Sequence, residues 1–346
     1  MTIPTIAPVD RGLAVPVQAH LDDLTKPPGS LGRLEEIALW YCLATGTASP
    51  RLDHKRHVIF AADHGVAKSG VSAFPQEVTP QMVRNMLAGG AAINALTRHA
   101  DADVRIVDVG VADPLDNADG LIRRKVAFGT DDIAQAPAMT DAQFQQALQA
   151  GIEQADQAAT DGIHILSVGE MGIGNTTPAA AVCAALVPCD PAIAVGRGTG
   201  VDDATLEKKR AVVQQALARH SGTEVDGCAV LTSLGGFEIA AMTGLMLGAA
   251  AHRIPTVVDG FIATASALAA IRIEPSIQNY LLFAHRSAEQ GHRRVFETLD
   301  IRPVLDLDMR LGEGTGAILA VTLVQAAIRT YNEMATFSSA SVSKNA

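Results

Sequence analysis

The chain alternates short apolar runs with longer stretches of helical periodicity. Seven runs rich in β-branched and apolar residues each end in a glycine or polar cluster, and they occupy residues 57–65, 104–110, 163–175, 192–200, 228–236, 255–260 and 280–285. Each run is followed by a helical pattern, and this repeated strand–loop–helix order is typical of a mainly parallel sheet with helices packed on its faces. We therefore predict an α/β fold with seven strands in a mainly parallel sheet.

The two ends of the chain lie outside this alternation. Residues 15–45 predict helices that are interrupted at the sequence KPPGS, and residues 313–335 predict one helix followed by a polar tail. We predict that the segments 1–50 and 313–346 pack together as a small helical domain. Residues 51–312 then form the large α/β domain, which suits a chain of 346 residues.

Polar side chains gather where the predicted strands end. These positions carry Asp63, His64, Asp108, Glu170, Asn175, Asp259 and His285. In parallel α/β folds, ligands bind outside the carboxyl ends of the strands, so this edge is the predicted site. For the Asp63–His64 pair, Asp259 and His285, we favour turn-stabilising or capping roles. The pair has no third ligand at close spacing, so we predict no metal site.

Composition and charge narrow the class of protein. The net charge of −10 argues against a basic face for nucleic acid or for an anionic membrane, so any phosphate site must be local. The four cysteines, Cys42, Cys183, Cys189 and Cys228, show neither zinc-site spacing nor a disulfide framework. The chain has neither a secretory N-terminal pattern nor an apolar run of about 18 residues. We expect a cytoplasmic protein with small-molecule ligands.

Two glycine-rich loops are candidates for phosphate binding. The segment 169–181, GEMGIGNTTPAAA, leads from a predicted strand into a helix whose exposed N–H groups could hold a phosphate, but a capped helix after a glycine turn explains it equally well. The segment 196–210, GRGTGVDDATLEKKR, matches neither a Walker loop nor a dinucleotide fingerprint. Its Lys208 and Lys209 could assist an anion or simply form a solvated helix face.

Two further segments suggest a pocket for a flat ring. The loop after His64 contains Phe74, Pro75 and Gln81, and an aromatic ring with an amide could sandwich a planar ligand. The segment MRLGEGTGA, residues 309–317, places Glu313 between two glycines. A glutamate at a helix start is stabilised by the helix dipole. The glycines suggest a second role, in which a ligand approaches the backbone while the carboxylate acts as a general base.

Taken together, long motifs in one order resemble the family of nicotinate-nucleotide–dimethylbenzimidazole phosphoribosyltransferases. The resemblance covers nearly the whole chain, through LTKPPGSLGRLE, ADHGV, GEMGIGNTTPAAA, LGGFEIAAMTGLMLGAA, DGFIATASALAA, HRSAEQG and MRLGEGTGAILA. It implies a Rossmann-like sheet, a small helical domain from both chain ends, and a homodimer. The implied reaction transfers 5-phosphoribose from nicotinate mononucleotide to 5,6-dimethylbenzimidazole, with inversion from β to α, in assembly of the cobalamin nucleotide.

The resemblance also implies roles for particular residues. Glu313 matches the catalytic base, and Glu170 matches a second carboxylate near the reacting groups. The implied donor and phosphate contacts are Gly174, Asn175, Thr176, Gly198, Gly200 and Lys209. The implied base pocket comprises Phe74, Pro75, Gln81, Met82 and Leu311, and the sequence leaves open whether Gln81 or Met82 faces the ring.

This chemistry requires no metal and no cofactor, because the pyridinium leaving group departs as a neutral ring. Carboxylates beside the developing ribosyl cation would act as they do in glycoside hydrolysis. Two other functions remain open: a nucleotide N-glycosidase that uses water as acceptor, and a non-catalytic protein that binds nicotinate nucleotides. Release of nicotinate without an added base would indicate the first, and lack of turnover the second.

Overall fold

A six-stranded parallel sheet forms the centre of the computed structural model, which describes residues 3–187, 190–198, 200–220, 226–340 and 342–343. The strands within these residues are β1 (Lys55–Ala62), β2 (Asp103–Gly110), β3 (Ile122–Arg123), β4 (Ile165–Met171), β5 (Thr256–Val258) and β6 (Leu281–Phe283). Their order across the sheet is β3-β2-β1-β4-β5-β6. This order reverses between β1 and β4, which is the switch point where parallel α/β folds bind ligands. The predicted parallel α/β fold, which is Rossmann-like, is confirmed.

Five of the seven predicted strands are confirmed, and two predictions are wrong. The run 228–236 forms helix α9 (Gly227–Leu234), and the run 192–200 begins with helix α7 (Pro191–Ala194), while Thr199 lies outside the described residues. Asp226 caps α9 by accepting hydrogen bonds from the N–H groups of Cys228 and Ala229. Short buried apolar runs suit a helix as well as a strand, which explains the error. The two-residue strand β3 was not predicted.

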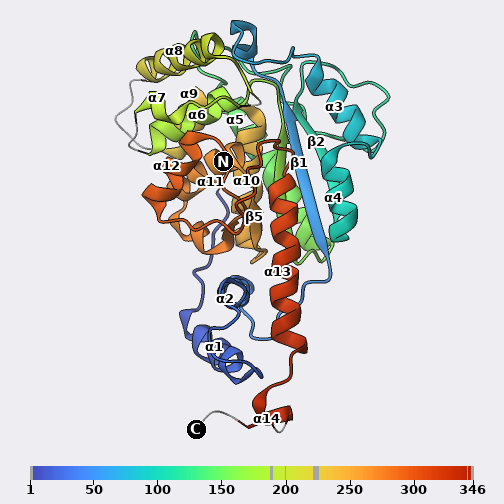
Figure 1. Cartoon of the computed structure of the whole chain (residues 1–346). Coiled ribbons are helices and arrows are strands. Elements are labelled where there is room, and N and C mark those ends of the chain that lie inside the picture. The colour runs from blue at the N-terminus through green and yellow to red at the C-terminus, as the bar shows by residue number, and fades with distance from the viewer. Residues whose placement is uncertain (1–2, 188–189, 199, 221–225, 341, 344–346) are drawn as a thin grey trace.

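Helices cover both faces of the sheet (Figure 1). The core on one side is built with α5 (Asp141–Thr160), α6 (Thr176–Leu186), α8 (Asp203–Arg219), α9, α10 (Phe237–Ala251), α11 (Phe261–Ile273) and α12 (Gln290–Leu299), of which α10 and α11 pack directly on the strands. The core on the other side is built with α1 (Ala14–Asp23), α2 (Arg33–Thr45), α3 (Val78–Leu87), α4 (Ala92–Ala100) and α13 (Thr315–Glu333), of which α3, α4 and α13 pack directly on the strands. Short helices complete the set: η1 (Arg11–Leu13), η2 (Gly65–Ser69), η3 (Pro275–Tyr280) and α14 (Phe337–Ala340).

Strand β1 shows why the sheet is buried on both sides. All eight of its residues are buried. Val58 and Phe60 contribute to the core on the α10 side, and Ile59 and Ala61 to the core on the α13 side. Successive side chains of a strand point to opposite faces, so a continuous apolar run is what a central parallel strand requires.

The chain ends form helices near the positions predicted. Helices α1 and α2 are separated by the KPPGS segment, and the predicted 313–335 helix is α13. In Figure 1, α13 extends from the sheet down to α1 and α2. Its first turn is joined to the large sheet through Asp259, and Tyr331 and Asn332 near its end bond the carbonyls of Ala48 and Pro50. The small helical domain, 1–50 with 313–346, remains a prediction.

Two findings concern what the described residues lack. None of their helices combines the length and apolar character needed to cross a membrane. Cys42, Cys183 and Cys228 form no disulfide among the described residues, and Cys189 lies outside them.

Candidate active site at the carboxyl ends of the strands

A cavity of about 300 Å³ opens at the carboxyl ends of β4, β5 and β6. Its walls are formed by Phe74, Val78, Met82, Glu170, Met171, Gly172, Ile173, Asn175, Thr176, Gly198, Asp259, Gly260, Phe261, Ile262, Ala263, His285, Ser287, Glu289, Arg310, Leu311, Gly312 and Glu313. This is a typical ligand pocket: a mostly apolar lining with a few polar groups that converge. The sheet edge predicted as the site is therefore where the cavity lies.

Glu313 enters this cavity from a left-handed turn. Gly312, Glu313 and Gly314 have φ angles of 87°, 62° and 84°, and helix α13 begins immediately afterwards. A positive φ is ordinary for glycine but costs a glutamate about 1–3 kcal/mol. Only 6% of Glu313 is exposed, and its Oε2 accepts a hydrogen bond from the N–H of Ile93 at 3.3 Å. Burial raises the pKa of Glu313.

The glycines beside Glu313 make room for protein atoms. A Cβ atom at position 312 would lie 2.5 Å from Oε1 of Glu170, so a side chain there would have to displace the second carboxylate. A Cβ atom at position 314 would lie 2.0 Å from the ring of His57. Our interpretation that these glycines give a ligand access to the backbone needs correcting for Gly314, which faces His57; Gly312 lines the cavity beside Glu170.

Glu170 is the second carboxylate of the cavity and lies near the end of β4. Only 7% of the residue is exposed, and Asn175 Nδ2 donates a hydrogen bond to its Oε2. Burial raises the pKa of Glu170 to about 8, and the negative charges of Glu238, Asp259 and Glu313 act in the same direction. Glu170 is therefore mostly protonated at neutral pH in the absence of a ligand.

The predicted phosphate residues meet in a smaller cavity of about 50 Å³ that shares walls with the first. Its lining includes Gly174, Asn175, Thr176, Gly198 and Lys209. Lys209 is 1% exposed, and its Nζ donates hydrogen bonds to Thr176 Oγ1 at 2.9 Å and to the Gly196 carbonyl at 3.0 Å. Burial lowers the pKa of this lysine. Gly200, also predicted, lines neither cavity.

The predicted base-binding residues divide into two groups. Phe74, Met82 and Leu311 line the larger cavity, whereas Pro75 and Gln81 do not and are exposed to solvent. Phe74 and Leu311 remain 49% and 54% exposed. The sequence left open whether Gln81 or Met82 faces the ring, and the structure places Met82 in the cavity wall.

Asp63 and His64 each form a hydrogen bond with a residue elsewhere in the chain. His64 Nε2 lies 2.7 Å from Glu238 Oε1, and Asp63 Oδ2 accepts a hydrogen bond from the N–H of Ala112 at 2.8 Å. His64 and Glu238 are both buried, and neither lines the cavity. No group of three or more His, Cys, Asp or Glu residues within the described part of the chain is placed to hold a metal ion.

Asp259 and His285, which the sequence placed at the predicted edge with capping roles favoured, both line the cavity. Asp259 also caps, because its Oδ1 accepts a hydrogen bond at 2.8 Å from the N–H of Ala317 in the first turn of α13. Sequence reasoning missed other residues of the cavity wall. Ser287, Glu289 and Arg310 also line it and were not singled out. For Arg310, its position directly before Leu311 was the available signal.

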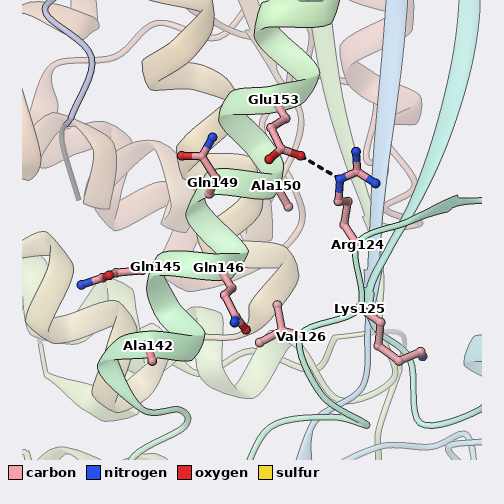
Figure 2. A pocket seen from close by; sticks show the side chains of 9 residues that line it. All are labelled: Arg124, Lys125, Val126, Ala142, Gln145, Gln146, Gln149, Ala150 and Glu153. Carbon is pink, nitrogen blue, oxygen red and sulfur yellow. Dashed lines mark hydrogen bonds and ion pairs between the residues drawn. The ribbon is translucent and has the colours of Figure 1, made fainter.

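A wider hollow of about 630 Å³ lies between helix α5 and residues 124–126, and Figure 2 shows its lining. Glutamine side chains of α5 form much of one wall. Its charged groups are paired: Arg124 with Glu153 at 2.7 Å, and Lys125 with Asp108 at 2.9 Å. None of the residues predicted to carry chemistry lines this hollow, so the cavity at the strand ends is the candidate active site.

Comparison with known proteins finds relatives over nearly the whole chain. A family model described as a phosphoribosyltransferase matches residues 6–342. Relatives named nicotinate-nucleotide–dimethylbenzimidazole phosphoribosyltransferase include one from Pelodictyon phaeoclathratiforme, 56% identical over 98% of this chain and 96% of its own length. Another, from Chloroflexus aggregans, is 52% identical over 99% of this chain and 97% of its own length.

A solved structure gives the same result for the fold. The crystal structure of CobT from Thermus thermophilus is similar with a TM-score of 0.93 and 47% sequence identity, covering 96% of this chain and all of that one. The family model spans almost the whole chain, and more than half of the residues are identical in these two relatives. The chain belongs to the family of nicotinate-nucleotide–dimethylbenzimidazole phosphoribosyltransferases.

Proposed function

We propose that this protein transfers the 5-phosphoribosyl group of nicotinate mononucleotide to 5,6-dimethylbenzimidazole. The products are α-ribazole 5′-phosphate and nicotinate, and the anomeric carbon inverts from β to α. The observation that carries the proposal is that Glu313 and Glu170 converge in one cavity beside a subsite built around the buried Lys209. Family membership supports the same assignment.

The donor phosphate occupies the smaller cavity. Thr176 and Asn175 stand at the N-terminus of α6, where backbone N–H groups and the helix dipole favour an anion. Lys209 adds a positive charge that is already oriented by Thr176 and Gly196. This arrangement directs the ribose toward Glu170 and Glu313 in the adjoining cavity.

The carboxylates act at the reacting carbon. One ring nitrogen of dimethylbenzimidazole attacks C1′, the bond from C1′ to the pyridinium nitrogen breaks, and its electron pair remains on the nicotinate ring. Glu313 takes the proton from the other ring nitrogen as that N–H becomes acidic. Glu170 faces the positive charge that develops on the ribose, and this charge lowers the pKa of Glu170 and favours its ionised form.

Other features of the proposal rest on chemistry and on the resemblance. The leaving ring departs neutral, so the reaction proceeds without a metal or cofactor, and activity should survive exhaustive chelation. The protein acts in the cytoplasm as a homodimer, with small-molecule partners and no nucleic acid or membrane. Loss of turnover on chelation that a divalent ion restores would refute metal independence, and light scattering of the purified protein tests the dimer.

One experiment tests the function directly. The purified protein is incubated with nicotinate mononucleotide and either dimethylbenzimidazole, a purine or a phenol, and the products are identified by mass and by anomeric configuration. We expect an α-nucleotide that forms only when a base is present. Nicotinate release without any base would indicate an N-glycosidase, and tight donor binding without turnover would indicate a binding protein.

A further inference from the structure

The turn that carries Glu313 is held from outside the cavity by a buried histidine. His57 belongs to β1, and its residue exposure is 0%. Its Nε2 lies 2.9 Å from the main-chain oxygen of Glu313. A carbonyl oxygen can only accept, so Nε2 carries the hydrogen and donates it to this oxygen.

A second contact fixes the tautomer of the same ring. His57 Nδ1 lies 2.8 Å from the hydroxyl oxygen of Ser167, its register partner on the neighbouring strand β4. Because Nε2 carries the hydrogen, Nδ1 accepts the hydroxyl proton of Ser167. Burial lowers the pKa of His57 to about 4, so the ring is neutral at neutral pH. Both ring nitrogens are therefore satisfied without any charge.

Two glycines make this contact possible. A Cβ atom at position 314 would lie 2.0 Å from His57 Cε1, and one at position 169 would lie 2.3 Å from the Glu313 oxygen. The imidazole and the turn can approach each other only because both positions lack a side chain. On the opposite side, the Glu313 carboxylate is held by the N–H of Ile93 in the first turn of α4.

We propose that His57 is a positioning residue for Glu313: by donating to its main-chain oxygen, His57 keeps this glutamate in the left-handed conformation that directs its carboxylate into the cavity. The proposal rests on the proposed function, in which Glu313 is the base. His57 is not among the residues that line the cavity, so it acts on the reaction through Glu313 and does not touch substrate.

The expected effect follows from the geometry of proton transfer. Without the His57 donor, the Glu313 oxygen is left buried and unpaired, and the glutamate is free to relax from its positive φ. The carboxylate then moves relative to the acceptor N–H. A misplacement of about 1 Å at a reacting group can reduce the rate about 100-fold. Donor binding, which depends on the Lys209 subsite, should be unaffected.

The test compares two replacements of His57. Phenylalanine keeps a flat ring but cannot donate, whereas glutamine keeps a donor near the Nε2 position. We expect His57→Phe to lower kcat about 10- to 100-fold, with the dissociation constant for nicotinate mononucleotide, measured by calorimetry, unchanged within about twofold. His57→Gln should recover most of this loss. His252→Phe is the control for the same replacement elsewhere, because His252 is an exposed histidine that bonds Asp156 and lies outside the cavity lining.

A double-mutant cycle separates positioning from a general structural role. In a Glu313→Gln background the proton acceptor is already absent, so adding His57→Phe should cost less than about threefold in kcat. An equal loss in both backgrounds, or a higher donor KM with normal kcat, overturns the proposal. If His57→Phe does not fold, Ser167→Ala replaces it: this variant frees His57 Nδ1 and should lower kcat about three- to tenfold at unchanged donor affinity, and a normal kcat overturns the proposal equally.

The same measurements distinguish failure of the proposed function from failure of the role proposed for His57. If the unmodified protein forms no α-nucleotide, or if Glu313→Gln is fully active, the proposed function loses its reaction or its base and the role of His57 is lost with it. If both behave as proposed and His57→Phe retains normal turnover, only the role of His57 is overturned.

Discussion

The two ends of the cavity are built differently. At the donor end, Lys209, Asn175 and Glu170 are between 1% and 7% exposed, and each already has a hydrogen-bond partner within the protein. At the acceptor rim, formed by Phe74, Met82 and Leu311, the side chains are apolar, and Phe74 and Leu311 are about half exposed. One end is thus organised before a ligand arrives, and the other gains its contacts when a ligand binds.

This difference matches what each end has to recognise. A phosphate and a reacting carbon need fixed charges and fixed distances, and organising these groups in advance avoids the cost of ordering them during the reaction. A flat apolar base needs surface contact, which an open apolar rim provides without demanding one particular ring. Substitutions at the donor end should therefore change rate or donor affinity strongly, and those at the rim should change acceptor affinity modestly.

The largest effect is expected for Glu313→Gln. Glutamine preserves the shape of the side chain but cannot accept a proton, so kcat should fall about 10²- to 10⁴-fold, the usual contribution of a positioned base. Binding of nicotinate mononucleotide should persist, because the donor subsite is untouched. The measurement is steady-state turnover to the α-nucleotide together with calorimetric donor binding.

The competing explanation for Glu313 gives a different result. If the glutamate only supports the start of α13 and bonds the N–H of Ile93, its replacement should lower the melting temperature slightly and leave turnover nearly intact. A stable variant with near-normal kcat would remove the base from the mechanism.

The second-largest effect is expected for Lys209→Ala, which should weaken binding of the donor phosphate. Lys209→Ala removes a buried charged donor worth about 1.5–3 kcal/mol, which corresponds to about a 10- to 150-fold weaker donor affinity. Lys208→Ala is the matched control, because the neighbouring Lys208 is exposed and does not line the subsite. Donor KM and acceptor KM are measured for both variants. Equal donor affinity in Lys209→Ala and Lys208→Ala would contradict the phosphate assignment.

The sequence predicts the donor end better than the rim, for a physical reason. Residues Gly174, Asn175 and Thr176 follow a strand and open a helix, and this local order places their N–H groups at the sheet edge. Lys209 is distant in sequence, and periodicity alone could not show whether it was buried; only the packing of α8 against α6 brings it to Thr176. The side of α3 that faces the ligand is likewise set by tertiary packing.

The hydrophobic pattern predicted the sheet correctly where its strands are long. β1, β2 and β4 each have seven or eight residues and give clear signals. α9 is short and rich in apolar residues, and such a segment gives the same pattern whether it is a helix or a strand. The role of His57 was invisible for another reason: Glu313 lies 256 residues away, and a contact over that separation leaves no local pattern.

The burial of the Glu170 carboxyl group should also make the free energy of unfolding depend on pH. Folding raises the pKa of Glu170 from 4.5 to about 8, so the folded protein holds a proton that the unfolded chain releases between these values. This contribution to stability is complete below pH 4.5 and is lost as the pH rises toward 8, by at most about 1.4 kcal/mol per pH unit. Glu170→Gln lacks this titration.

Thermal melts between about pH 5 and pH 9 test this sign. The melting temperature of Glu170→Gln relative to the unmodified protein should increase as the pH rises toward 8 and then level off. Parallel profiles for the two proteins across this range would show that Glu170 is not protonated in the folded state. The acceptor rim of Phe74, Met82 and Leu311 contains no carboxylate, so Phe74→Ala should show no such dependence and serves as the comparison variant.

The smallest effect is expected at the rim, where α3 presents two adjacent residues differently. Met82 lines the cavity, and Gln81 is exposed to solvent. Met82→Ala removes part of the apolar surface that a bound ring would cover, worth about 1 kcal/mol, so the KM for dimethylbenzimidazole should rise about fivefold at saturating donor. Gln81→Ala should leave both substrate constants unchanged. A different result would be weaker binding of dimethylbenzimidazole in Gln81→Ala and unchanged binding in Met82→Ala. The ring would then be held by a polar amide, and the contrast between a polar donor end and an apolar rim would be wrong.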